Sequence, residues 1–200
     1  LAVSTDSSSP SYTLTAGGTS GVTAGVIKFR ATNEAVNLQK VGLKLTNTAS
    51  STPSDLTQVY LYAGSNIMTT TGTAVAANTL IGTATFTGNN TIATSTLSTA
   101  VQLPKDMDAT IIVKADIADI GSIQPGTEGD LVAIDYANSQ GTGNNSGATV
   151  SGTVGVTTGV AGLRIFNTIP TVAVDSTLPG TGVNDGRLMQ FKIAADSHGQ

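Results

Sequence analysis

The residues best suited to chemistry in this sequence are aspartates that precede two strand-like segments. Asp106 and Asp108 form an Asp-x-Asp pair before one segment, and Asp130 begins another. Loop carboxylates supply the hard oxygen atoms of which Ca²⁺ takes about six to eight. Asp106, Asp108 and Asp130 are therefore candidate calcium ligands, and no cofactor other than calcium is suggested by the sequence. The alternative is that these aspartates only accept hydrogen bonds within their own turns, because no EF-hand pattern accompanies them.

Catalytic chemistry of other kinds finds little support in the residue types. His198, the single histidine, lies beside a glycine near the end of the sequence, and cysteine is absent. A Ser-His-Asp triad requires a histidine that packing and a carboxylate hold in place, and zinc or copper sites require several His or Cys ligands. Paired carboxylates could act as in a glycosidase, but the chain has no Trp and only four Tyr for a sugar-binding platform. We expect a protein without enzymatic activity.

Two triplets have the form of N-glycosylation sites, which makes Asn89 and Asn144 candidate glycan acceptors. Both lie in turn-rich segments that we expect to be loops, although a chain this rich in Asn and Thr also produces such triplets by chance. The glycine-rich stretches 141–147 and 180–186 resemble phosphate-binding loops. Neither is followed by a helix-like pattern, as a phosphate site requires, so we expect hairpin loops.

The composition indicates which kind of secondary structure positions these residues. Only 11% of the 200 residues are charged, against about 25% in ordinary soluble domains. Thr, Ser, Asn and Gly take their place, which favours strands and turns over helices. The net charge is -4 and basic residues do not cluster, so we expect no nucleic-acid partner. No apolar run approaches the roughly 20 residues of a membrane-spanning helix.

Apolar and polar residues alternate along the chain, which is the pattern of half-buried strands. Val26–Thr32 shows it clearly, and the pattern changes parity at Gln39-Lys40, which predicts a bulge or bend. About ten short strands separated by Gly-, Pro- and Asn-rich turns predict an all-β fold, a β-sandwich. The further predicted strands are Gln58–Tyr62, Leu80–Phe86, Thr96–Leu103, Ala109–Ile117, Asp130–Tyr136, Thr149–Val156, Gly162–Phe166 and Thr171–Asp175.

Residues 24–38 and 186–200 are similar enough to suggest an internal repeat. The match pairs Phe29 with Phe191, and a lead-in that begins at Pro10 matches one that begins at Pro170. Further upstream, the segment 1–3 matches 163–165. We therefore predict that 1–9 ends a preceding unit, 10–168 forms a sandwich domain and 169–200 opens the next unit. The alternative is that Thr- and Gly-rich β sequences resemble one another without repetition.

The run Val26–Leu45 resembles the tandem immunoglobulin-like repeats of large bacterial surface-layer and cell-surface structural proteins, as do 59–64, 111–117 and 129–136. The resemblance implies an extracellular, cell-surface structural protein, a repeat unit of a self-assembling surface layer or filament on a prokaryotic cell. Its partner would be itself, through strand edges, with terminal strands that belong to flanking repeat units. The resemblance transfers no catalytic residue and no metal ligand. An adhesin or ligand-binding sandwich, with or without calcium, remains the alternative, followed by an accessory domain of a secreted enzyme.

Overall fold

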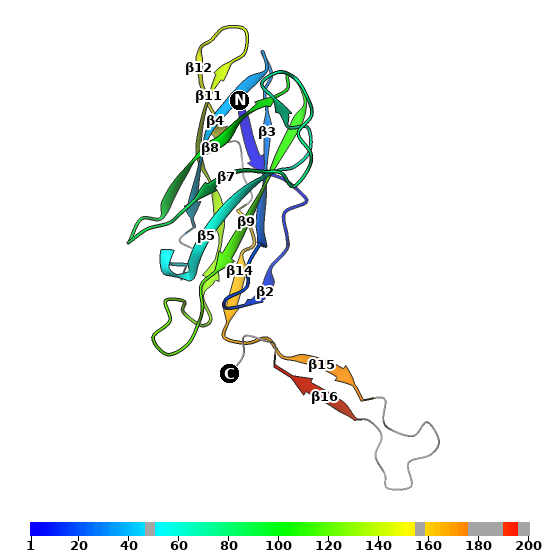
Figure 1. The fold of residues 1–200 in the computed structure, drawn as a ribbon, viewed down its shortest axis with the longest axis vertical. Coiled ribbons are helices and arrows are strands. Elements are labelled where there is room, and N and C mark those ends of the chain that lie inside the picture. The colour runs from blue at the N-terminus through cyan, green and yellow to red at the C-terminus, as the bar shows by residue number, and fades with distance from the viewer. Residues whose placement is uncertain (47–50, 155–158, 176–189, 196–200) are drawn as a thin grey trace, which may run out of the picture.

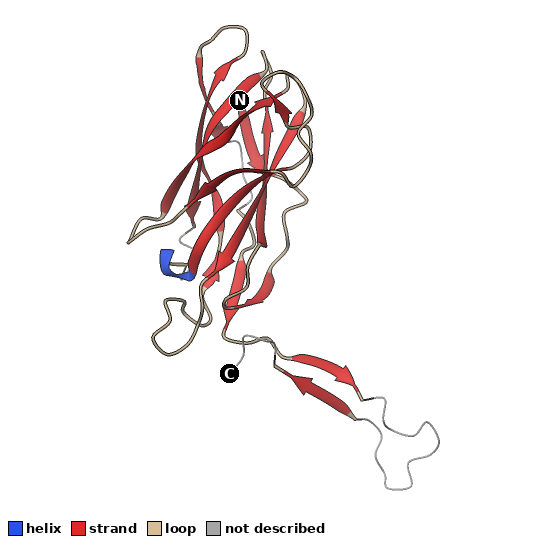
Figure 2. Ribbon diagram, viewed as in Figure 1, coloured by secondary structure: helices blue, strands red, loops and turns tan. Residues whose placement is uncertain are grey.

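The computed structural model describes residues 1–46, 51–154, 159–175 and 190–195, and these fold almost entirely as strands (Figures 1 and 2). No α-helix occurs in those four ranges, as the composition predicts, and η1 is a single 3₁₀ turn. The elements are β1 (Ala2–Thr5), β2 (Thr13–Ala16), β3 (Val22–Arg30), β4 (Val36–Leu45), η1 (Pro53–Asp55), β5 (Leu56–Ala63), β6 (Met68–Thr69), β7 (Leu80–Ala84), β8 (Ile92–Leu103), β9 (Asp108–Ile117), β10 (Leu131–Val132), β11 (Ile134–Gly143), β12 (Thr149–Ser151), β13 (Thr153–Val154), β14 (Leu163–Phe166), β15 (Thr171–Val174) and β16 (Phe191–Ala194).

Two main sheets form a β-sandwich, which confirms the predicted all-β fold class. One sheet has six strands in the order β13-β1-β3-β9-β5-β7, and the other has five in the order β12-β11-β4-β8-β6. A small sheet β10-β14-β2 extends the sandwich at its lower end in Figure 1, and β15 and β16 form a separate hairpin. The pairs are antiparallel, except that β1 pairs with β13 and β2 with β14 in parallel.

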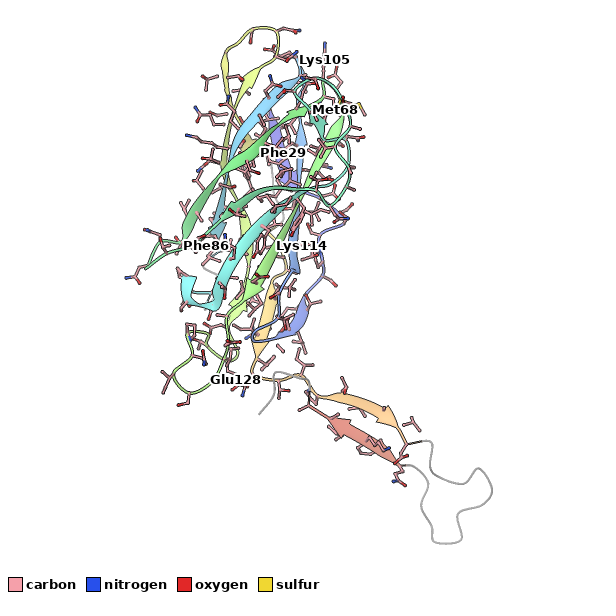
Figure 3. The ribbon with its side chains drawn as sticks, in the orientation of Figure 1. Phe29, Met68, Phe86, Lys105, Lys114 and Glu128 are labelled. Carbon is pink, nitrogen blue, oxygen red and sulfur yellow. The ribbon has the colours of Figure 1, made fainter. Side chains whose placement is uncertain are left out.

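Alternating side chains from the two main sheets make the core. In β9 every second residue is buried, from Ala109 to Ile117. Phe29 of β3 is fully buried and meets the ring of Tyr136 of β11 edge-on, with centroids 5.9 Å apart. This contact joins the six-stranded sheet to the five-stranded sheet, and Figure 3 shows Phe29 within the sandwich. The other large core residues are Leu38, Leu43, Leu61, Ile67, Ile81, Leu103, Ile111, Ile134, Leu163 and Ile165.

The predicted change of parity at Gln39 is confirmed as a bulge. β4 pairs with β8 and β11 up to Leu38, omits Gln39 and resumes at Lys40. The bulge lets Leu38 on one side of it and Val41 on the other both point into the core, although they are three residues apart. Without it, one half of β4 would turn its apolar residues to solvent.

Two predicted strands are each divided in the structure. The segment 130–136 breaks at Ala133, whose carbonyl oxygen accepts hydrogen bonds from the backbone N and Oγ1 of Thr46; β10 before the break and β11 after it belong to different sheets. The segment predicted over 149–156, whose residues 155 and 156 lie outside the described ranges, breaks at Gly152. A Cβ there would collide with the hydroxyls of Tyr136 and Ser139.

The two ends of the chain differ in how they relate to the sandwich. β1 lies inside the six-stranded sheet between β13 and β3, and its Val3 is buried. Residues 2–5 are thus part of this sandwich, although we expected 1–9 to end a preceding unit; the division into repeat units itself stays a prediction. The β15–β16 hairpin, in contrast, projects away from the lower end of the sandwich (Figure 1).

Candidate assembly surface

The β15–β16 hairpin carries one apolar face. Its strands pair antiparallel, with Val174 opposite Phe191 and Val172 opposite Ile193. Because side chains alternate across a strand, these four lie on the same face, which we call the hairpin apolar face. They are 79%, 55%, 66% and 64% exposed, respectively. The opposite face is small or polar and consists of Thr171, Ala173, Lys192 and Ala194.

Local polar contacts hold the two strands together. The amide N of Asp175 donates to the carbonyl oxygen of Gln190 over 2.9 Å, and Gln190 Nε2 donates to the Asp175 carboxylate over 3.0 Å. Lys192 Nζ lies 3.8 Å from the same carboxylate. A two-stranded hairpin is marginally stable by itself in water. The hairpin apolar face is therefore a candidate surface for a partner.

The loop between β9 and β10 is exposed at the end of the sandwich from which the hairpin leaves (Figure 1). Ile123 near its tip is 100% exposed and has a φ of 71°, a left-handed conformation that is strained for a β-branched residue. Beside the loop is a polar cavity of about 330 Å³, lined in part by Asp119, Gln124 and Asn167. The loop thus presents an apolar side chain to solvent at a strained position.

Asp55 fixes this loop to the sandwich. Its side chain is fully buried, and its two carboxylate oxygens accept hydrogen bonds from the backbone N and Oγ1 of Thr52 and from the backbone N of Thr127. The carbonyl oxygen of Asp55 also accepts a hydrogen bond from the N of Ala118. Both ends of the loop are therefore tied to one residue. Thr52 and Asp55 have the spacing of a capping box, but nothing in the local pattern reveals the distant partners Ala118 and Thr127.

The structure does not bring the predicted calcium ligands together. Asp108 accepts a hydrogen bond from Arg30 Nη1 over 2.8 Å, and this bond raises the pKa of the Arg30 guanidinium. Asp106 occupies a positive-φ turn position, with its backbone N bonded to the carbonyl oxygen of Ala31. Asp108 thus has a cationic partner within the protein, which explains the carboxylate without a metal.

Asp130 lies at the opposite end of the sandwich from this aspartate pair. Figure 3 shows Lys105, next to Asp106, near the top and Glu128, two residues before Asp130, near the bottom. The ten residues of β9 separate the two ends, a distance of roughly 30 Å. Among the residues that the structure describes, no cluster of three or more His, Cys, Asp or Glu could hold a metal ion. The predicted three-aspartate calcium site is therefore wrong as a grouping.

The two candidate glycan acceptors lie in exposed loops, as predicted, but in different surroundings. Asn89 belongs to a turn in which the backbone N of Asn90 bonds to the carbonyl oxygen of Thr87. Asn144 Oδ1 accepts hydrogen bonds over 3.3 Å from Asn37 Nδ2 and Gln102 Nε2, so its side chain lies along the sheet surface. Glycosylation at either residue stays a prediction.

Glu34 organises the loop that contains Asn144. Its carboxylate accepts hydrogen bonds from Ser146 Oγ over 2.5 Å and from the backbone N of Ser146 and Asn145. These bonds, the Ser146 side chain first, hold the pKa of Glu34 below its usual range. The residues are more than 100 positions apart in the chain, so sequence reasoning had no signal for this contact. The glycine-rich stretch 141–147 is therefore a hairpin loop tied to a carboxylate, not a phosphate site.

No protein-family model matches the chain, and no curated protein matches it. His198 and the glycine-rich stretch 180–186 lie outside the described residues. Within the described part of the chain, no helix is long and apolar enough to cross a membrane. The hairpin apolar face and the loop with Ile123 are consequently the surface features that bear most on function.

Proposed function

We propose that this protein is an extracellular structural protein, immunoglobulin-like in its sandwich, that serves as a repeat unit of a self-assembling surface layer or filament on a prokaryotic cell. The hairpin apolar face is the observation that supports the proposal. The four large apolar side chains of the projecting hairpin are exposed to water and do not contribute to the core of the sandwich. An exposed apolar patch of this kind is typical of a surface that another protein element covers.

The outer faces of the sandwich suit a packed array. Strand β8 buries Ala93, Ser95 and Leu97 and exposes Thr94 and Thr96 between them. Exposed hydroxyl groups stay hydrated and so disfavour non-specific association. Because the surface carries few charges, close contact with a neighbour requires little free energy for the desolvation of ions. The antiparallel ladder β3-β9-β5 runs along the length of the sandwich. The role of each unit is mechanical, with the hydrogen-bonded ladder as its rigid part.

Electron microscopy of the purified protein over a range of concentrations tests this function. We expect ordered filaments or two-dimensional arrays that grow with concentration and tolerate added salt. Leu80 begins the edge strand β7 and is 44% exposed, so Leu80→Lys should weaken lateral association through that edge, whereas Thr83→Ser should leave it intact. A protein that stays monomeric at every concentration would refute a self-assembling role.

A further inference from the structure

The hairpin repeats the strand pairing with which the sandwich itself begins. In the six-stranded sheet, β1 pairs antiparallel with β3 so that Val3 lies opposite Phe29. In the hairpin, β15 pairs antiparallel with β16 so that Val174 lies opposite Phe191. One neighbouring pair agrees as well, since Ala2 opposite Arg30 corresponds to Ala173 opposite Lys192. The agreement is one of residue type, register and strand direction together.

This register revises the sequence match between the two segments. The matching lead-ins set Leu14 of β2 against Val174 of β15. In the structure, however, β2 pairs with β14 in parallel, whereas the partner of β3 on that side is β1. The structural counterpart of Val174 is therefore Val3. The hairpin corresponds to β1 and β3, without a counterpart of β2 in the described residues.

The two strand pairs differ in what covers them. Val3 and Phe29 are 1% and 0% exposed, whereas Val174 and Phe191 lie on the exposed hairpin apolar face. We propose that the hairpin is the first strand pair of a second sandwich of the same type, and that its partner is a set of strands with the pattern of β4 to β14. This inference rests on the proposed role as a repeat unit and specifies what one unit binds.

The complete sandwich shows what the partner must supply. β9 adds antiparallel to β3 and places Ala109 opposite Phe29. The facing sheet supplies Tyr136, whose ring meets Phe29 edge-on. The outer edge of β16 pairs with no other strand in the described ranges. That edge should accept an antiparallel strand with a small residue opposite Phe191, and the hairpin apolar face should accept a sheet with an aromatic side chain.

Strand direction also gives the second sandwich an orientation. β1 starts at the upper end of the sandwich in Figure 1 and runs downward, while β15 starts at the lower end and runs away from it. The upper end of the second sandwich would therefore meet the lower end of the first, in a head-to-tail array. The loop that exposes Ile123 lies at this lower end, so a head-to-tail neighbour accounts for its exposed, strained position.

A fused chain tests this proposal directly. Because Ile193 corresponds to Ala31, Ala195 corresponds to Asn33. We would express residues 1–195 followed by residues 34–168 of the same sequence and measure backbone amide exchange in β15 and β16. We expect their exchange to slow by roughly two orders of magnitude or more relative to the 200-residue protein, while exchange in β9 of the first sandwich stays the same.

Three matched chains make the outcome decisive. Phe191→Asp in the fused chain should return the hairpin to fast exchange, whereas Lys192→Arg, which introduces the residue found at position 30, should not. A chain of residues 1–168 followed directly by 34–168 lacks the hairpin, and its appended segment should remain unfolded. The proposal is overturned if that segment folds equally well without the hairpin, or if the hairpin stays unprotected in the fused chain.

The same measurements separate this inference from the proposed function. If hairpin exchange in the 200-residue protein slows as concentration increases, then hairpins cover one another and the second-sandwich assignment is wrong, although self-assembly holds. If the fused chain forms a second sandwich but microscopy shows only monomers, the assignment holds and the self-assembling role fails.

Discussion

Phe29 and Phe191 occupy matching positions in two strand pairs, yet we expect their replacement by alanine to have very different effects. Phe29 has no exposed surface and packs against Tyr136, so Phe29→Ala leaves a cavity in the core and should lower the free energy of unfolding by about 3–5 kcal/mol. Phe191 is 55% exposed and belongs to a hairpin outside the sandwich. Phe191→Ala should change the stability of the sandwich by less than about 0.5 kcal/mol.

Urea unfolding and thermal melting of dilute 200-residue protein measure both effects. For a domain of this size each kcal/mol shifts the melting temperature by about 2–4 °C. Phe29→Ala should therefore melt about 6–20 °C lower than the unmodified protein, while Phe191→Ala melts with it. Equal losses at the two positions would show that the hairpin packs into the same cooperative core, and the argument from exposure would then be wrong.

Four further outcomes follow from individual contacts. Asp55→Ala should cost about 2–4 kcal/mol in urea unfolding, because it removes the hydrogen bonds that the fully buried carboxylate accepts from Thr52 and from the Thr127 backbone N. Hydrogen bonds from Ser146 lower the pKa of Glu34, so they stabilise the folded loop fully at pH values above the ordinary glutamate pKa. This stabilisation is lost as the pH falls through the lowered pKa of Glu34 in the folded protein, and the exchange rate of the Ser146 amide should rise over that pH range. Glu34→Gln should remove this pH dependence. Ile123→Gly should stabilise the isolated protein by about 1 kcal/mol in thermal unfolding, because glycine adopts the left-handed conformation without strain. Addition of calcium or a chelator should leave the melting temperature unchanged, because the predicted ligands lie at opposite ends of the sandwich.

Local alternation carried enough information to predict the strands and the bulge in β4. The apolar residues of 36–45 must all face the core, and Gln39 is the residue at which their parity changes. The crossings between sheets at Ala133 and Gly152 were not predictable in this way. Apolar residues run through both breaks, as Leu131–Ile134 in one segment and as Val150 and Val154 in the other. The contacts at the breaks come from Thr46 and Tyr136, which local sequence does not reveal.

Local sequence patterns also could not show which of the predicted site residues lie together in the fold. Asp106 and Asp130 both sit next to strands, but topology decides whether two loops share an end of a sandwich, and here the length of β9 separates them. The repeat was visible as a pair of similar segments around Phe29 and Phe191. The sequence alone matched β15 to β2, because short alternating segments look alike. The pairing register instead makes β1 the counterpart of β15.

The energy of the exposed face indicates why an array of such units would hold together. Full burial of a large apolar side chain contributes about 1.5–3 kcal/mol, and more than half of each of the four residues on the hairpin apolar face is exposed. Covering them would contribute roughly 4–8 kcal/mol, which is comparable to the net stability of a whole domain, about 5–15 kcal/mol. Each added unit would therefore stabilise the hairpin of the unit before it, and the array would gain stability through nearest-neighbour contacts, as repeat proteins do.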